Sequence, residues 1–169
     1  MRFSALILGI LIFSGFKSMG QSQAFDKLIF NAPPAEWSKQ ETLDKVTYSN
    51  YNVKGAEPAT LTIFKSMPVT GKADQQLPQY WRHYLQLSDT AAAPRPKKQY
   101  TNDGDPMVIA SGEAAGPEGK GYYVLAVYHT ETWAQPLLIF TPSAKAYRLQ
   151  LAEWMDRLQT VRLAKAGKK

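Results

Sequence analysis

The chain has 169 residues, a formal net charge of +6 at neutral pH and no cysteine. The lack of cysteine excludes disulfide bonds, thiolate metal ligands and a cysteine nucleophile. The basic residues form no dense stripe, so their pattern is typical of a solvated surface, and we expect no nucleic-acid partner.

Residues 1–24 are predicted to be a secretory signal peptide. Arg2 precedes the apolar run 5–13, and small and polar residues follow it. This run is shorter than the roughly 20 apolar residues that cross a bilayer, so no membrane span is expected after cleavage. The alternative is a buried N-terminal helix. Ser22 and Ala24 favour cleavage after Ala24, and a site nearer Gly20 is the alternative. With no cysteine for a lipid anchor, we expect an exported protein, periplasmic or extracellular.

One domain is predicted over residues 25–163, followed by a flexible basic tail, 164–169. The chain shows no repeats and no break in composition. Loss of Arg2 and Lys17 leaves 18 basic and 14 acidic residues, a net charge of +4. A chain of this length is large enough to bury a core of its own.

The first predicted elements are an extended segment and a hairpin. Pro33 and Pro34 prevent a helix, so Phe30 and Trp37 are expected to hold this segment against the core. Residues 45–51 and 60–64 are rich in β-branched and aromatic residues, and the stretch between them has the composition of a turn. We expect these two strands to pair.

A helix is predicted to follow, with Asp74 as its N-cap and Pro78 in its first turn. Its apolar residues recur at the spacing of a one-sided stripe: Leu77, Trp81, Tyr84 and Leu85. The prolines from Pro94 onward cannot continue it.

The second half is predicted to be a three-stranded meander over residues 107–114, 122–130 and 135–141, with a short strand at 99–101. The runs 123–127 and 137–140 are apolar without alternation, which indicates strands covered on both faces. Thr141 and Pro142 then favour the start of a long amphipathic helix reaching Arg162.

These elements predict an α/β (α+β) fold. Two amphipathic helices must each bury an apolar stripe, and the sheet is the only surface large enough. We therefore expect an α/β/α sandwich, with a mostly antiparallel sheet of about six strands between two main helices.

The order of elements resembles the PsbP-like superfamily. The resemblance is carried by the N-terminal Phe30, Pro33 and Trp37, the helix around Tyr80 and Trp81, the meander and the capped last helix, over about residues 28–163. It is similar to the sandwich of a photosystem II extrinsic subunit and of a Ran-binding nuclear-transport factor, and to exported bacterial proteins. The resemblance implies the fold and a non-catalytic role, and it carries over no functional residue.

The sequence shows no catalytic, cofactor or metal motif. His83 and His129 lack the repeated spacing of metal ligands. The acidic stretch 102–105 lacks the further oxygen ligands of a calcium loop, and no phosphate loop or serine elbow is present. We therefore predict no catalytic residue, no cofactor and no metal, and the two histidines are expected to have structural roles.

Six residues are candidates for contact with a ligand or partner. Trp133 is placed at a hairpin tip, where it either contacts a partner or folds back onto the sheet edge. Arg95, Lys97 and Lys98 either receive an anionic group or are solvated. His83 and His129 are the last two candidates, because a hydrolase cleft would need one of them.

The favoured hypothesis is an exported, non-catalytic binding or scaffold domain, with a protein or glycan partner in the cell envelope or exterior. One alternative is a secreted hydrolase, which requires His83 or His129 within hydrogen-bond reach of a serine or carboxylate in a pocket. Another is weak binding of an anionic polymer through Arg95, Lys97 and Lys98.

Overall fold

A computed structural model describes residues 21–69 and 71–164. This part of the chain contains two helices and two antiparallel sheets. The elements in chain order are β1 (Ser22–Phe25), β2 (Leu28–Asn31), β3 (Ser38–Glu41), β4 (Lys45–Ser49), β5 (Thr60–Phe64), β6 (Met67–Pro68), α1 (Ala73–Tyr84), β7 (Lys97–Tyr100), β8 (Pro106–Gly116), β9 (Gly119–His129), β10 (Trp133–Thr141), α2 (Ala144–Gln159) and β11 (Arg162–Leu163). The α+β class is as expected.

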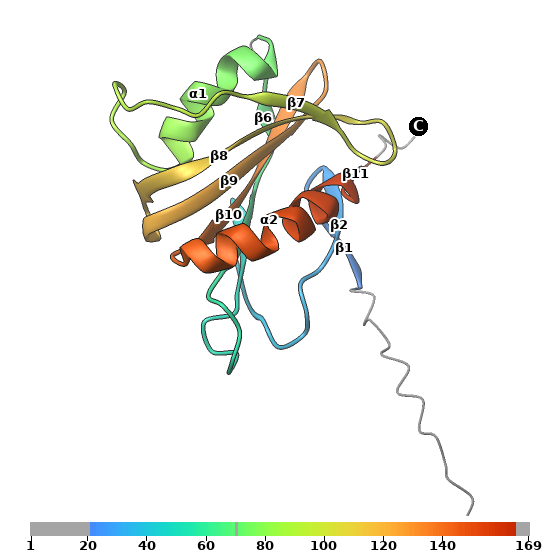
Figure 1. Ribbon diagram of the computed structural model, residues 1–169. Coiled ribbons are helices and arrows are strands. Elements are labelled where there is room, and N and C mark those ends of the chain that lie inside the picture. The colour runs from blue at the N-terminus through green and yellow to red at the C-terminus, as the bar shows by residue number, and fades with distance from the viewer. Residues whose placement is uncertain (1–20, 70, 165–169) are drawn as a thin grey trace, which may run out of the picture.

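The main sheet has eight strands, so the expectation of about six was wrong. Its order is β3-β4-β5-β10-β9-β8-β7, and β6 pairs with β10 beside this path. Figure 1 labels β7, β8, β9 and β10 of this sheet. The predicted hairpin is β4 and β5, and the predicted meander is β8, β9 and β10. The sequence did not reveal β3 and β6, because Ser38–Glu41 holds no apolar residue and β6 has only two residues.

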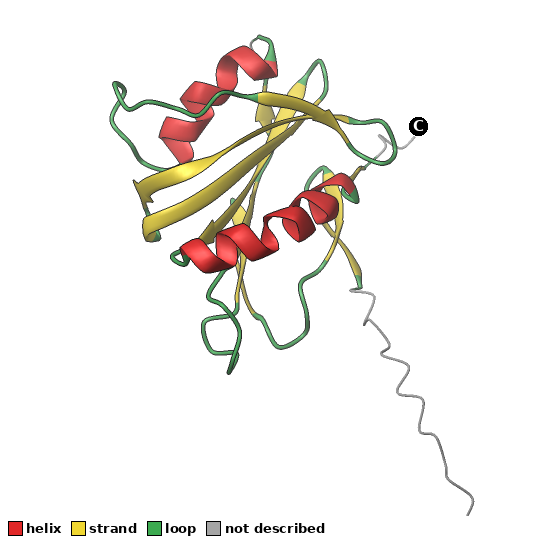
Figure 2. Cartoon of the chain, viewed as in Figure 1, coloured by secondary structure: helices red, strands yellow, loops and turns green. Residues whose placement is uncertain are grey.

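The two helices cover opposite faces of this sheet (Figure 2). Along β9 the side chains alternate between them: Tyr123, Leu125 and Val127 pack on the α1 side, and Val124, Ala126 and Tyr128 on the α2 side. All six are buried. This is why the run 123–127 is apolar without alternation: neither face of the strand meets water.

Helix α1 begins one residue before the predicted cap. Its N-cap is Lys72, whose side chain makes no capping hydrogen bond, and Asp74 lies in the first turn. Pro78 therefore stands beyond the first turn, inside the helix. The predicted stripe is correct at its centre, since Leu77, Trp81 and Leu85 are buried.

Helix α2 begins later than predicted because Thr141 belongs to β10. The N-cap is Ser143, whose Oγ accepts a hydrogen bond of 3.0 Å from the amide of Ala146. The hydroxyl of Thr141 instead donates to the carbonyl of Pro58, at 2.6 Å. The helix ends at Gln159, and the short strand β11 replaces its predicted last turn.

The second sheet, β1-β2-β11, joins the N-terminal and C-terminal parts of the described chain. It is fastened to the main sheet through Gln135 of β10, which is fully buried. The side-chain amide of Gln135 donates to the carbonyls of Phe25 and Phe64 at 3.0 and 2.9 Å, and its oxygen accepts from the amide of Lys27 at 2.9 Å. A buried amide that is fully paired in this way fixes the position of both sheets.

The predicted signal peptide and tail lie mostly outside the described residues, which leave out 1–20 and 165–169. Neither α1 nor α2 is long and apolar enough to cross a membrane.

Candidate functional site

A cavity of about 260 Å³ lies between α2 and the sheet. We call it the α2 pocket. Its lining comes from β2, the segment after it, β5, β10 and α2, and from Asn50 and Val161, which lie outside the helices and strands: Phe30, Asn31, Pro33, Pro34, Trp37, Asn50, Thr60, Leu61, Leu137, Ile139, Gln150, Glu153, Trp154, Arg157, Leu158 and Val161.

The walls of the α2 pocket are mainly apolar and aromatic. Leu137 and Ile139 of β10 are buried side chains of the core, and Leu61 of β5 is half-buried beside them. Trp154 of α2 is buried and Trp37 is half-buried. Apolar and aromatic walls with a few polar groups are typical of small-molecule sites.

Residues 33–37, which were predicted to be extended, instead include a turn that bounds the pocket. Phe30 is buried in the core, and Trp37 packs against the same cluster, as predicted from the sequence. The amide of Trp37 donates to the carbonyl of Pro34 at 3.0 Å, which closes a turn before β3 begins.

The rim of the α2 pocket carries charges that compensate each other. Nε and an Nη of Arg157 both donate to Oε1 of Glu153, at 3.1 and 2.8 Å. The two residues are four apart on α2, and both side chains are exposed. Because the two opposite charges cancel, this pair gives the rim hydrogen-bonding groups without a net charge.

A second, more open cleft of about 610 Å³ gathers ionisable side chains at the start of α1. Lys98 and His129 line it together with Asp74, Tyr100 and Glu131. Lys98 and His129 belong to the six predicted contact residues, and this cleft brings them together. Burial lowers the pKa of His129 below 6.5, against the opposing effect of the Asp74 carboxylate, so the ring is neutral at pH 7.

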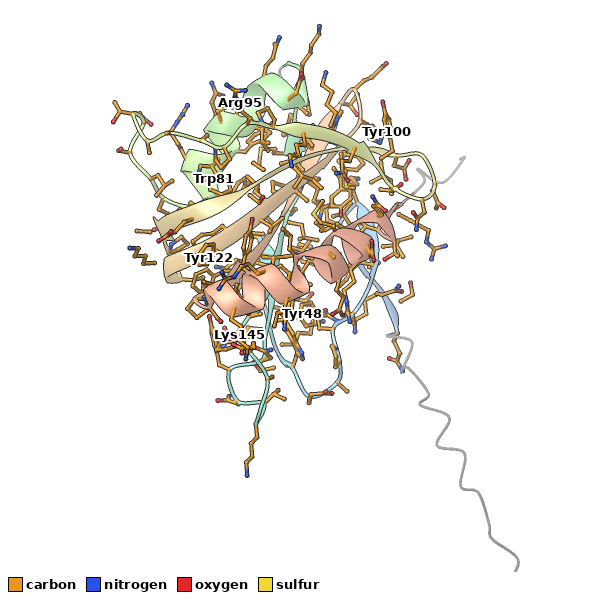
Figure 3. The ribbon with its side chains drawn as sticks, viewed as in Figure 1. Tyr48, Trp81, Arg95, Tyr100, Tyr122 and Lys145 are labelled. Carbon is orange, nitrogen blue, oxygen red and sulfur yellow. The ribbon has the colours of Figure 1, made fainter. Side chains whose placement is uncertain are left out.

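Lys98 is paired rather than free. Its Nζ lies 2.9 Å from a carboxylate oxygen of Asp74. This hydrogen bond lowers the pKa of Asp74 and raises that of Lys98. Arg95 and Lys97 are exposed, and Figure 3 shows Arg95 beside α1 and Tyr100 on β7. The three basic residues therefore do not form a single unpaired patch.

His83 and His129 lie near opposite ends of α1. His83 is exposed in the last turn, where its ring meets the edge of Tyr84 at 4.9 Å. Over residues 21–69 and 71–164, neither imidazole hydrogen-bonds to a serine or a carboxylate, and the same residues show no group of three metal-ligating side chains. The contact that the hydrolase hypothesis requires is not found among these residues.

Trp133 folds back onto the sheet. It is the first residue of β10, where it pairs with Pro68 of β6, and it is half-buried against the α2-side core. Of the two predicted positions, contact with a partner at a hairpin tip or packing against the sheet edge, the structure therefore has the packed one.

The α2 pocket could not be predicted from the sequence. Its two sides, 30–37 and 150–161, lie more than 100 residues apart in the chain, so no local pattern joins them. The paired prolines and the aromatic residues at 30 and 37 were the only sequence signal.

Comparison with known proteins supports the fold alone. No family model and no curated protein matches the chain. A crystal structure from Bacteroides thetaiotaomicron VPI-5482, determined at 1.50 Å resolution, superposes with a TM-score of 0.54 at 11% identity. The match covers 89% of this chain and 51% of the other, so this chain spans about half the length of the protein in that crystal structure.

Proposed function

We propose that this chain is an exported binding domain that holds a small, uncharged ligand in the α2 pocket. The observation that carries the proposal is the aromatic-walled cavity of about 260 Å³ under α2. Export is supported by Arg2, the apolar run 5–13 and the small residues after it. A binding role also agrees with the PsbP-like resemblance, which itself stays a prediction.

The size of the pocket limits the ligand. Cavities that hold drug-sized ligands measure roughly 300–1,000 Å³, so this one suits a molecule of one or two rings. Trp37 and Trp154 offer ring faces or edges to a flat or ring-shaped apolar body. The ligand that fits best is therefore a compact ring compound.

The rim determines the polar end of the ligand. Asn31 and Gln150 supply amide donors and acceptors, and the Glu153–Arg157 pair supplies no net charge. An ionised ligand would lose hydration and gain no opposite charge that is free. The polar end is therefore a hydroxyl or amide rather than a carboxylate or ammonium group.

A fluorescence titration with two matched probes tests this proposal. 1-Naphthylamine has two fused rings and is uncharged at neutral pH, and 5-amino-1-naphthalenesulfonate has the same rings with a sulfonate. We expect saturable binding of the uncharged probe and at least about tenfold weaker binding of the anion, because an unpaired charge at the rim costs more than 1.4 kcal/mol.

Two variants place the bound probe. Trp37→Ala removes a wall and Leu61→Phe fills the cavity, and each should weaken binding about tenfold or more. The matched control is Leu149→Ala, since Leu149 is on α2 but 70% exposed and outside the pocket. Equal affinity in all four proteins would overturn the assignment of the ligand site.

A further inference from the structure

The start of the described chain is part of the folded domain. Strand β1 pairs with β2 along its whole length, from Ser22 opposite Asn31 to Phe25 opposite Leu28. One residue earlier, the carbonyl of Gln21 accepts a hydrogen bond of 3.1 Å from the amide of Ala32. Residues 22–25 therefore form the outer strand of the small sheet, and Gln21 adds one hydrogen bond beyond its end.

Side chains of β1 also satisfy groups in the core. The hydroxyl of Tyr48, a residue only 4% exposed, donates to Oε1 of Gln23 at 2.6 Å. Tyr48 lies on the side of the sheet that α2 covers (Figure 3). Removal of Gln23 would leave this hydroxyl without its acceptor, which is costly for a polar group in so buried a side chain.

The sequence offers signal peptidase two bonds that look alike. Ser22 and Ala24 precede the bond after Ala24, and Ser18 and Gly20 stand in the same relation to the bond before Gln21. Both satisfy the requirement for small side chains at these two positions. The peptidase acts on an unfolded chain during export, so the fold blocks neither bond, but cleavage after Ala24 removes Gln23 and most of β1.

We infer that the signal peptide is cleaved between Gly20 and Gln21, so that the mature domain keeps β1 and begins with glutamine. This inference rests on the export that we propose above. It replaces the bond after Ala24, which small residues alone favoured.

A glutamine at the N-terminus is a site of modification. The new α-amine of Gln21 attacks the Cδ carbon of its own side-chain amide. A C–N bond forms, the bond from Cδ to the side-chain nitrogen breaks, and ammonia leaves with the proton that the amine gives up. The product is a five-membered lactam, pyroglutamate. The backbone carbonyl of residue 21 is unchanged by this reaction, so it can still accept the hydrogen bond from the Ala32 amide.

Mass spectrometry of the processed protein tests this inference. The full chain is expressed with a C-terminal tag in an export-competent bacterium and purified from the envelope or medium. We expect an intact mass and an N-terminal peptide that begin at Gln21, with a fraction lighter by one ammonia. A chain that begins at Phe25 would overturn the inference and leave export standing, whereas an unprocessed chain found only in the cytoplasmic fraction would overturn both.

Two matched variants identify the bond independently. Gly20→Leu places a bulky residue next to the inferred bond and should abolish the Gln21 product. Ala24→Leu makes the same change at the other bond and should leave processing as in the wild type. The reverse result would overturn the inference. Both substitutions keep residues 21–23, so the contact between Gln23 and Tyr48 is unaffected.

Discussion

Helices α1 and α2 cover opposite faces of one sheet, yet they close those faces in different ways. On the α1 face, Trp81 is 1% exposed and packs among buried side chains of β8, β9 and β10. On the α2 face, Trp154 is 8% exposed and borders a cavity of about 260 Å³. We call the α1 face the filled face and the α2 face the hollow face. The comparison indicates a division of roles, in which the filled face contributes most to stability and the hollow face is free to bind a ligand.

The largest difference in stability between the two faces is expected when the central tryptophan of each is replaced by alanine. Trp81→Ala should lower the free energy of unfolding by about 3–5 kcal/mol, because a full set of packing contacts is lost and a cavity remains. Trp154→Ala should cost less, since one side of this ring already faces a cavity and has fewer contacts to lose. Urea denaturation measures both, and an equal or larger loss for Trp154→Ala would break the comparison.

Larger side chains should also destabilise the α1 face more than the α2 face, with smaller losses of stability than the tryptophan variants. At Gly121, an added Cβ would lie 2.6 Å from both the Thr141 carbonyl oxygen and Cε2 of Phe140. Because backbone cannot give way, Gly121→Ala should destabilise the domain by about 1–3 kcal/mol. The measurement is again urea denaturation.

Leu61→Phe is the corresponding addition on the hollow face. Its extra carbons enter the α2 pocket, so the cost should stay below about 1 kcal/mol. A loss for Leu61→Phe that matches that of Gly121→Ala would mean that the pocket has no usable space.

A smaller effect on stability is expected at the hydrogen bonds that join the start of α2 to the loop before β5. Glu57 accepts from Lys145 Nζ at 2.9 Å and from Ser143 Oγ at 3.0 Å, at the start of α2. The hydrogen bond from Lys145, followed by that from Ser143, lowers the pKa of Glu57 below 4.5. A lowered folded-state pKa means that this contribution to stability is complete above pH 4.5 and is lost as the pH falls through the folded value.

Glu57→Gln should therefore lower Tm slightly at pH 7, with a difference from wild type that shrinks on acidification below pH 4.5. Thermal unfolding followed across this range measures the difference. The control is Glu36→Gln, because Glu36 is exposed and forms no ion pair in the described residues. A difference that grows toward low pH would contradict the role of the Glu57 carboxylate.

Local patterns explain why the filled face could be predicted from the sequence. The stripe of Leu77, Trp81 and Leu85 repeats within one helix, and the apolar run of β9 indicates burial on both faces. The ends of the helices were less accurate because Thr141 and Ser143 are both good caps, and the length of β10 decides between them.

The hollow face could not be predicted because it depends on long-range geometry. Trp37 and Trp154 each look like ordinary core residues, and only the folded chain places both beside one cavity. Lys98 illustrates the same limit, since its basic neighbours suggested an anion site and the structure pairs it with Asp74 of α1.

The claim that the α2 pocket binds a small, uncharged ring is tested most directly by crystals soaked with 4-bromophenol, a single ring with one polar end. Anomalous scattering locates the bromine without reference to the surrounding density. The account predicts a bromine between α2 and the floor formed by Leu61, Leu137 and Ile139. A well-diffracting crystal with bromine only on its outer surface, and none under α2, would contradict it.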